Sequence, residues 1–81
     1  EQRQVVAERC LVALVEGCRD GEWVVRYAVA VGLEALAPAL AAEAARARLR
    51  QALEGLGDNP EEEAPVVQLR ARLALRRLSE A

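Results

Sequence analysis

The chain has 81 residues, of which 53% are hydrophobic, and its formal net charge at pH 7 is −2. This length suits one small domain, and the apolar content excludes a chain that stays disordered because it cannot form a core. The slightly acidic charge balance excludes the basic face that is expected of a nucleic-acid-binding domain.

Helices are predicted, in chain order, over residues 2–17, 22–37, 38–54 and 65–78. Ala, Leu, Val, Arg and Glu dominate the sequence, whereas Ile, Phe and Thr are absent. This mixture favours helix over sheet. A polar loop is expected over residues 57–64. The sequence therefore predicts an all-α fold.

The limits of the third helix are predicted from proline and glycine. Pro38 is allowed in the first turn of a helix, so we place the start of the third helix there. Gly55 and Gly57 are helix stop signals, so this helix is expected to end near residue 54. The three acids that follow, residues 61–63, are expected to form a solvated loop and not a metal site.

The segment 20–36 is a turn followed by the most apolar helix of the chain. At about 100° per residue the helix has two faces. A helix that is apolar on nearly all sides is expected to be covered on more than one side. We therefore expect Trp23 to be largely buried. One face carries Val25, Val29, Gly32, Leu33 and Leu36, and the other carries Trp23, Arg26, Tyr27, Ala30 and Glu34.

The two cysteines, Cys10 and Cys18, are predicted to be free thiols. They lie on one predicted helix, about 12 Å apart along its axis, which is too far for a disulfide. The chain has no histidine, so a Cys–His metal site or catalytic dyad cannot form. Cys10 falls on the apolar face and is expected in the core, whereas Cys18, beside Arg19, is the more reactive candidate.

The longest apolar region, residues 23–42, is interrupted by Arg26, Glu34 and Pro38. A helix that spans a bilayer needs about 20 mostly apolar residues without such interruptions. The sequence also lacks a signal-peptide pattern. We therefore expect no membrane span and a soluble, intracellular protein.

The chain contains an internal repeat at a spacing of 44 residues. Two helix–turn–helix units at roughly this spacing are typical of HEAT-type solenoids. We therefore predict one domain over residues 1–81, a short α-solenoid of two HEAT-like antiparallel helix pairs, with repeats over 1–37 and 38–81. The matched residues are Val25 with Leu69, Arg26 with Arg70, Val29 with Leu73, and Ala30 with Ala74.

The segment 20–36 resembles the HEAT-like repeat of the phycobilisome lyases. That pattern is Asp, then Trp, then Val-Arg with Tyr or a small residue, then spaced Ala and Leu. The tail over residues 65–75 looks like the C-terminal end of the same group. The resemblance implies the C-terminal part of a subunit of an E/F-type bilin lyase. The matching residues are Asp20, Trp23, Val25, Arg26, Tyr27, Ala28, Ala30, Leu33 and Leu36.

Lyases of this group typically work as pairs of related solenoid subunits that deliver a linear tetrapyrrole, a bilin, to a cysteine of a phycobiliprotein. The resemblance therefore implies a related subunit and a phycobiliprotein as partners. It implies a bilin as substrate, with no permanently bound cofactor, and a place in the cytoplasm with phycobilisomes at the thylakoid surface. It leaves open whether this chain is itself an active lyase. The alternative function is a non-enzymatic HEAT-repeat scaffold for protein–protein interaction.

A bilin needs an apolar or aromatic surface, cations for its two propionates and acceptors for its pyrrole N–H groups. The bilin-binding candidates are Trp23 and Tyr27 for the surface, Arg26 for the cation, and Asp20 or Glu34 for the acceptors. In the structural alternative, Asp20 and Arg26 tie neighbouring repeats together and Trp23 packs between helices. No catalytic residue is predicted.

The first helix has an apolar arc that is too wide for one neighbour, and Val6, Leu11 and Val15 are its partner-interface candidates. A solenoid repeat contacts only its neighbours, and about three or more repeats are needed to bury a continuous core. We therefore expect a further repeat, a second copy of the chain or a partner subunit to cover this end.

Overall fold

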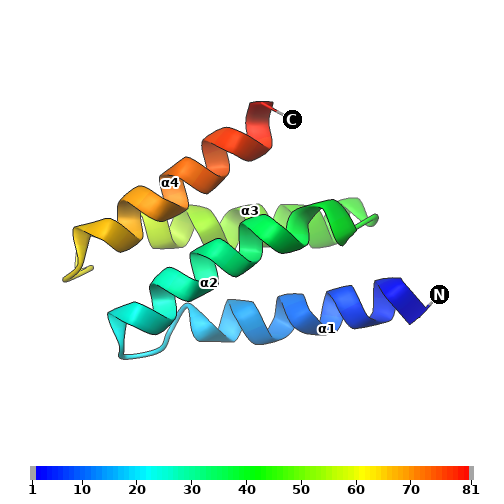
Figure 1. Ribbon diagram of the computed structural model, residues 1–81, viewed down its shortest axis with the longest axis horizontal. Coiled ribbons are helices and arrows are strands. Elements are labelled where there is room, and N and C mark those ends of the chain that lie inside the picture. The colour runs from blue at the N-terminus through cyan, green and yellow to red at the C-terminus, as the bar shows by residue number, and fades with distance from the viewer. Residues whose placement is uncertain (1, 81) are drawn as a thin grey trace.

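The computed structural model describes residues 2–80, which are all-helical and contain no strand (Figure 1). Within each of two pairs the helices run antiparallel, and α2 lies beside α4 (Figure 1). The predicted all-α fold is confirmed, and its two stacked helix pairs form a short α-solenoid. The elements are α1 (Gln2–Gly17), α2 (Trp23–Leu36), the 3-10 turn η1 (Ala37–Ala39), α3 (Glu43–Asp58) and α4 (Pro65–Glu80).

The third helix, α3, begins later than predicted. Pro38 lies in η1 instead, and α3 starts at Glu43. The bend between them places Leu40 in the core at 2% exposure. The 3-10 turn η1 is also held against α1, because the side-chain amide of Gln4 donates to the carbonyl of Ala39 at 2.9 Å. The local proline signal was overridden by these longer-range contacts.

The same helix also ends later than predicted, because Gly55 and Gly57 do not stop it. Continuing the helix to Asp58 places Leu56 in the core at 4% exposure. A Cβ atom at Gly57 would lie 3.2 Å from Cγ of Arg72, so the glycine allows α3 and α4 to approach closely. This packing outweighs the propensity cost of about 1 kcal/mol for a glycine inside a helix.

Small residues bring the helices close together around the core. Ala30 of α2 and Ala74 of α4 are fully buried where these two helices pack. Between α1 and α2, a Cβ at Gly32 would lie 3.1 Å from Cδ2 of Leu14. The core consists of Ala7, Leu11, Val29, Ala30, Leu33, Leu40, Leu49, Leu53, Leu56, Val67, Ala71 and Ala74.

Two predictions for α1 are wrong. Leu11, a partner-interface candidate, is buried at 3% exposure, and Cys10, expected in the core, is exposed. The buried side of α1 is centred on Ala7 and Leu11, so the helix is rotated about its axis relative to the expectation. Val6 is exposed and Val15 is half-buried. Of the three partner-interface candidates, Val6 alone lies fully at the surface.

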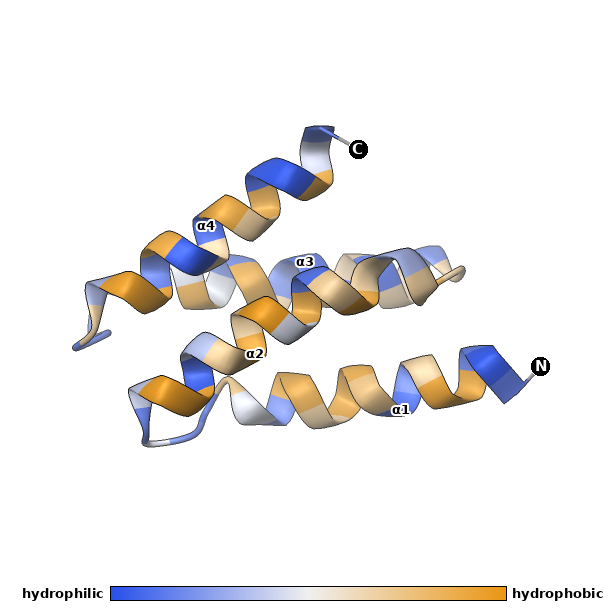
Figure 2. Ribbon diagram, in the orientation of Figure 1, coloured by the Kyte–Doolittle hydropathy of each residue, from blue (hydrophilic) through white to orange (hydrophobic). Residues whose placement is uncertain are grey.

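No helix within residues 2–80 combines the length and the apolar character that crossing a bilayer would require. The apolar residues of α2 nevertheless extend along most of its length, with only short hydrophilic segments (Figure 2). Exposed valines on α2 show that this apolar surface continues beyond the side that faces the core.

Candidate functional site

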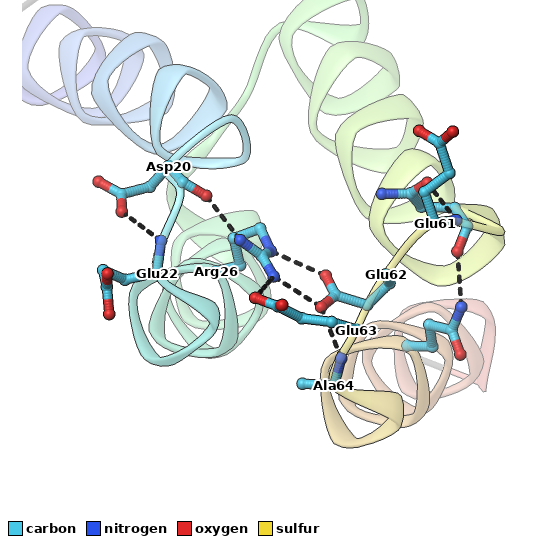
Figure 3. A network of polar contacts seen from close by, with 9 residues as sticks. Asp20, Glu22, Arg26, Glu61, Glu62, Glu63 and Ala64 are labelled. Carbon is cyan, nitrogen blue, oxygen red and sulfur yellow. Dashed lines mark hydrogen bonds and ion pairs between the residues drawn. The ribbon is translucent and has the colours of Figure 1, made fainter.

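The five predicted bilin-binding candidates lie on α2 and the turn before it, but the structure separates them into two groups. Arg26 reaches the loop between α3 and α4, and Asp20 meets Arg26 through its backbone carbonyl while its carboxylate points toward Glu22 (Figure 3). Trp23, Tyr27 and Glu34 follow one flank of α2, within about 40° of each other around the helix axis. That flank faces α4, because Glu34 pairs with arginines of that helix.

Arg26 connects the two turns at one end of the molecule (Figure 3). Its Nε and Nη2 donate to the two carboxylate oxygens of Glu62, at 2.8 and 2.7 Å. Its Nη1 donates to the backbone carbonyl of Asp20 at 2.7 Å, and Nη2 also lies 3.7 Å from Oε1 of Glu63. The bidentate contact with Glu62 is the strong form of an arginine–carboxylate interaction. Arg26 therefore acts as a tie between the two helix pairs.

Glu62 is the buried member of this network. Its side chain is 1% exposed, and its Oε2 also accepts from the backbone N–H of Ala64 at 2.9 Å. Hydrogen bonding to Arg26 lowers the pKa of Glu62 and raises the pKa of Arg26. The expectation of a wholly solvated acidic loop is thus wrong for Glu62, although the neighbouring Glu63 is exposed.

Asp20 shapes the entry to α2. Its Oδ1 accepts from the backbone N–H of Glu22 at 2.9 Å, which closes the turn before the helix (Figure 3). The carbonyl of Asp20 then receives the guanidinium of Arg26. Both residues thus have the structural role that the sequence analysis gave as the alternative to bilin binding.

Glu34 pairs with two arginines of α4. Nη2 of Arg70 lies 2.7 Å from Oε1 of Glu34, and Nη1 of Arg77 donates to Oε2 at 3.4 Å. The Arg70 contact joins opposite charges without well-aligned hydrogen-bond geometry, and within the described chain Nη1 of Arg70 is buried without an acceptor. Arg70, more than Arg77, lowers the pKa of Glu34.

Trp23 is 43% exposed, so the prediction that it is largely buried is wrong. The buried residues of α2 are Val29, Ala30 and Leu33, which lie from the middle of the helix onward, and the first turn is left uncovered. Tyr27, one turn further on, is half-buried and packs against the core. Residues four apart on a helix are neighbours, so the two aromatic side chains share one flank.

The Cys18 thiol shows no sign of activation. Burial raises the pKa of the Cys18 thiol, and the nearby charge of Arg19 opposes this only in part. Cys10 is exposed on α1. Among residues 2–80, no three His, Cys, Asp or Glu side chains are grouped to hold a metal ion.

The surface has two depressions that touch α2 or the turn before it, and the residues that line them differ in character. The larger, about 700 Å³, lies between the N-terminal half of α1 and η1, and Val6, Cys10 and Leu36 line it. The other, about 420 Å³, lies between the two turns and is lined by Arg26 and by the acidic residues 61–63. Because these acids surround Arg26, this depression is poorly suited to a ligand with carboxylates.

The flank of α2 therefore offers an aromatic end and a cationic end. Trp23 and Tyr27 form the first, and Arg70 and Arg77 of α4 meet the flank at Glu34. The distance from Trp23 to Glu34 along the helix axis is about 16 Å. Arg77 is 54% exposed, and its long hydrogen bond leaves donors free to face solvent. Such a surface can hold an elongated, flat, anionic molecule.

Comparison with known proteins finds a similarity to the bilin biosynthesis protein RpcF of Synechococcus sp. (strain WH8020). The two sequences are 42% identical over 83 residues, which cover 89% of this chain and 34% of that protein. The chain thus spans about a third of the length of the relative it matches. No family model matches the chain, and no solved structure matches it significantly. The predicted resemblance to the phycobilisome bilin lyases is confirmed by this similarity.

Proposed function

We propose that this chain supplies a bilin-contacting surface to a HEAT-repeat lyase or bilin chaperone subunit. That subunit would help to attach a linear tetrapyrrole to a cysteine of a phycobiliprotein. The similarity to a bilin biosynthesis protein supports the proposal. The structural observation that carries it is the exposed Trp23 beside Tyr27, because a large aromatic side chain left at the surface is typical of a binding site.

In this proposal the flank of α2 holds the bilin along its length. Trp23 and Tyr27 contact the flat ring system. Glu34 was the acceptor candidate from the sequence, but its two carboxylate oxygens already pair with Arg70 and Arg77, so its role is to hold Arg77 beside the bilin. The propionates pair with Arg77, whose guanidinium is exposed and held only at 3.4 Å by Glu34. Arg26 was the cation candidate from the sequence, but Glu62 already engages its guanidinium. The cation role therefore passes from Arg26 to Arg77.

The proposal includes two protein partners. One is the phycobiliprotein that provides the acceptor cysteine, and the other is a related HEAT-repeat lyase subunit. With these partners the chain would act in the cytoplasm near phycobilisomes at the thylakoid surface. The bilin is the substrate that passes between them.

The proposal is tested by titrating the chain with biliverdin, a free linear tetrapyrrole. Trp23 is the one tryptophan of the sequence, so its fluorescence reports on this flank alone. We expect a shift in the visible absorption of biliverdin together with quenching of the Trp23 emission. No change in either signal, with helical circular dichroism retained, would contradict the proposal.

A matched pair of arginine variants tests the cation role. Arg77→Gln removes the proposed propionate partner, and Arg76→Gln removes a neighbouring exposed arginine of the same helix. A charge-assisted hydrogen bond contributes roughly 1.5–3 kcal/mol, so Arg77→Gln should weaken biliverdin binding by about tenfold or more. Arg76→Gln should leave it nearly unchanged. Equal losses in the two variants would point to unspecific attraction.

The second candidate function is a scaffold for protein–protein interaction without bilin contact. The exposed valines of α2 favour it, because contiguous apolar surface is typical of an interaction site. A chain that binds a phycobiliprotein or a related subunit, but gives no biliverdin signal, would identify this function.

A further inference from the structure

One stripe of α2 is apolar and turned away from the core. Its residues follow the helical spacing i, i+4, i+7 and i+11, so they lie within about 60° of one another around the axis. All of them are exposed, and Val24 and Val31 are 58% and 39% exposed. We call these residues the outer stripe: Val24, Ala28, Val31 and Ala35.

The outer stripe is uncharged, which is unusual for the solvent-facing side of a helix. The charged residues of α2 are Arg26 and Glu34. Arg26 pairs with Glu62 in the loop between α3 and α4, and Glu34 pairs with Arg70 of α4. On the other flank, α1 packs close to Gly32. Neighbours therefore occupy the two flanks of α2, and the outer stripe is left between them facing solvent.

The order of large and small residues in the outer stripe is self-complementary. If two α2 helices pack antiparallel, Val24 of one lies opposite Ala35 of the other, and Ala28 lies opposite Val31. Each valine then meets an alanine, and the same contacts recur on the other side of the two-fold axis, as a closed symmetric dimer requires. A parallel arrangement would instead set valine against valine.

We propose that the outer stripe is a two-fold interface through which this chain binds a second copy of itself, with the two α2 helices antiparallel. The outer stripe carries no charge, so two copies can meet there without like charges coming opposite each other. Small residues at alternate positions let the helices approach closely. The outer stripe borders the flank of Trp23 and Tyr27, because Tyr27 and Val31 lie four residues apart on α2. None of its residues is a proposed bilin contact, so the dimer is tested in the absence of a bilin.

The first test is the mass of the chain in solution, measured by sedimentation equilibrium over roughly 1 to 500 µM, a range that brackets micromolar dissociation constants. We expect a concentration-dependent monomer–dimer equilibrium. A strict monomer at the highest concentration would overturn the proposal. Growth beyond the dimer would also overturn it, because open-ended assembly needs an interface without two-fold symmetry.

A matched pair of charge variants locates the interface. Val31→Glu places a carboxylate in the outer stripe, and Val66→Glu makes the same change on α4, where Val66 is similarly exposed at 43%. An unpaired carboxylate buried in an apolar interface is strongly unfavourable, so Val31→Glu should raise the dimer dissociation constant by about tenfold or more. Val66→Glu should leave the constant nearly unchanged. Equal effects, or a larger effect of Val66→Glu, would overturn the proposal.

An exchange of large and small residues tests the antiparallel register without any charge. Ala28→Val sets valine against valine at two symmetric places and should weaken the dimer, because overpacking is destabilising. The double variant Ala28→Val/Val31→Ala again sets a large residue opposite a small one and should recover most of the lost affinity. Circular dichroism verifies that every variant is folded. A double variant that is as weak as Ala28→Val alone would overturn the register.

Discussion

Gly17 lies at a close contact between α1 and α2, and its replacement by alanine tests this packing. A Cβ atom at Gly17 would lie 2.7 Å from Cγ2 of Val29, which is closer than unstrained carbon atoms come. Val29 is 5% exposed and its branched side chain has few alternative rotamers, so it cannot move aside easily. The substitution therefore forces the two helices apart.

The expected magnitude is a balance of two effects. Overpacking a core contact typically costs about 1–3 kcal/mol, whereas replacing a helical glycine by alanine gains up to about 1 kcal/mol. Gly17→Ala should therefore destabilise the chain by about 1–2 kcal/mol. In a domain of this size that lowers the melting temperature by roughly 4–16 °C. Thermal unfolding followed by circular dichroism measures the shift.

Gly55→Ala is the matched control. Gly55 is also helical, but a Cβ atom there would have no neighbour within 4 Å. The gain in helix propensity should then dominate and raise the melting temperature by a few degrees. If Gly17→Ala stabilised the chain as much as Gly55→Ala, the close contact between α1 and α2 would be refuted. In a double-mutant cycle, Gly17→Ala should cost less beside Val29→Ala.

Three further predictions concern the charged pairs, the thiols and the tryptophan. The folded-state pKa values of Glu34 and Glu62 are lowered, so their contribution to stability is complete above the unfolded-state pKa of about 4.3 and is lost as the pH falls through the folded-state values. The melting temperature should therefore fall in acid below that pH, and the paired substitutions Glu34→Gln and Glu62→Gln should flatten the fall. Iodoacetamide should modify the exposed Cys10 before Cys18, whose pKa is raised by burial; equal rates by mass spectrometry would contradict this order. Trp23→Ala should cost about 1–2 kcal/mol in urea unfolding, below the 3–5 kcal/mol of a core aromatic, because the side chain is 43% exposed.

The sequence predicted the helices best where local signals and packing agree. The limits of α1 were predicted as observed, and Pro65 was identified as the start of α4. The predictions failed at α3, where Pro38 and Gly57 are local signals for a start and a stop. Long-range contacts decide both places, because Leu40 is buried before the helix and Gly57 packs against α4.

The site was only partly predictable, because a charged residue in the sequence does not reveal its partner. The sequence analysis gave Arg26 two roles, and the structure shows it tied to Glu62 in the loop between α3 and α4. The three acids of residues 61–63 are chemically identical, so composition cannot say which one turns inward. The backbone of the loop selects Glu62, because this residue can reach both Arg26 and the N–H of Ala64.

The exposed surface of α2 illustrates what apolar content can and cannot determine. A helix that is apolar on nearly all sides requires cover. The sequence analysis placed an open apolar surface on α1, where Val5, Val6 and Val12 are exposed, but it did not predict the one on α2. Hydrophobicity counts apolar residues without giving their direction. The direction is fixed where Gly17 and Gly32 let α1 approach one flank of α2, and where Ala30 meets α4 on the other. Because both flanks are then filled from within the chain, the remaining apolar residues of α2 contribute little to the stability of a single copy. The proposed association through the outer stripe would account for their hydrophobicity, and the variants of Val31 and Ala28 measure it.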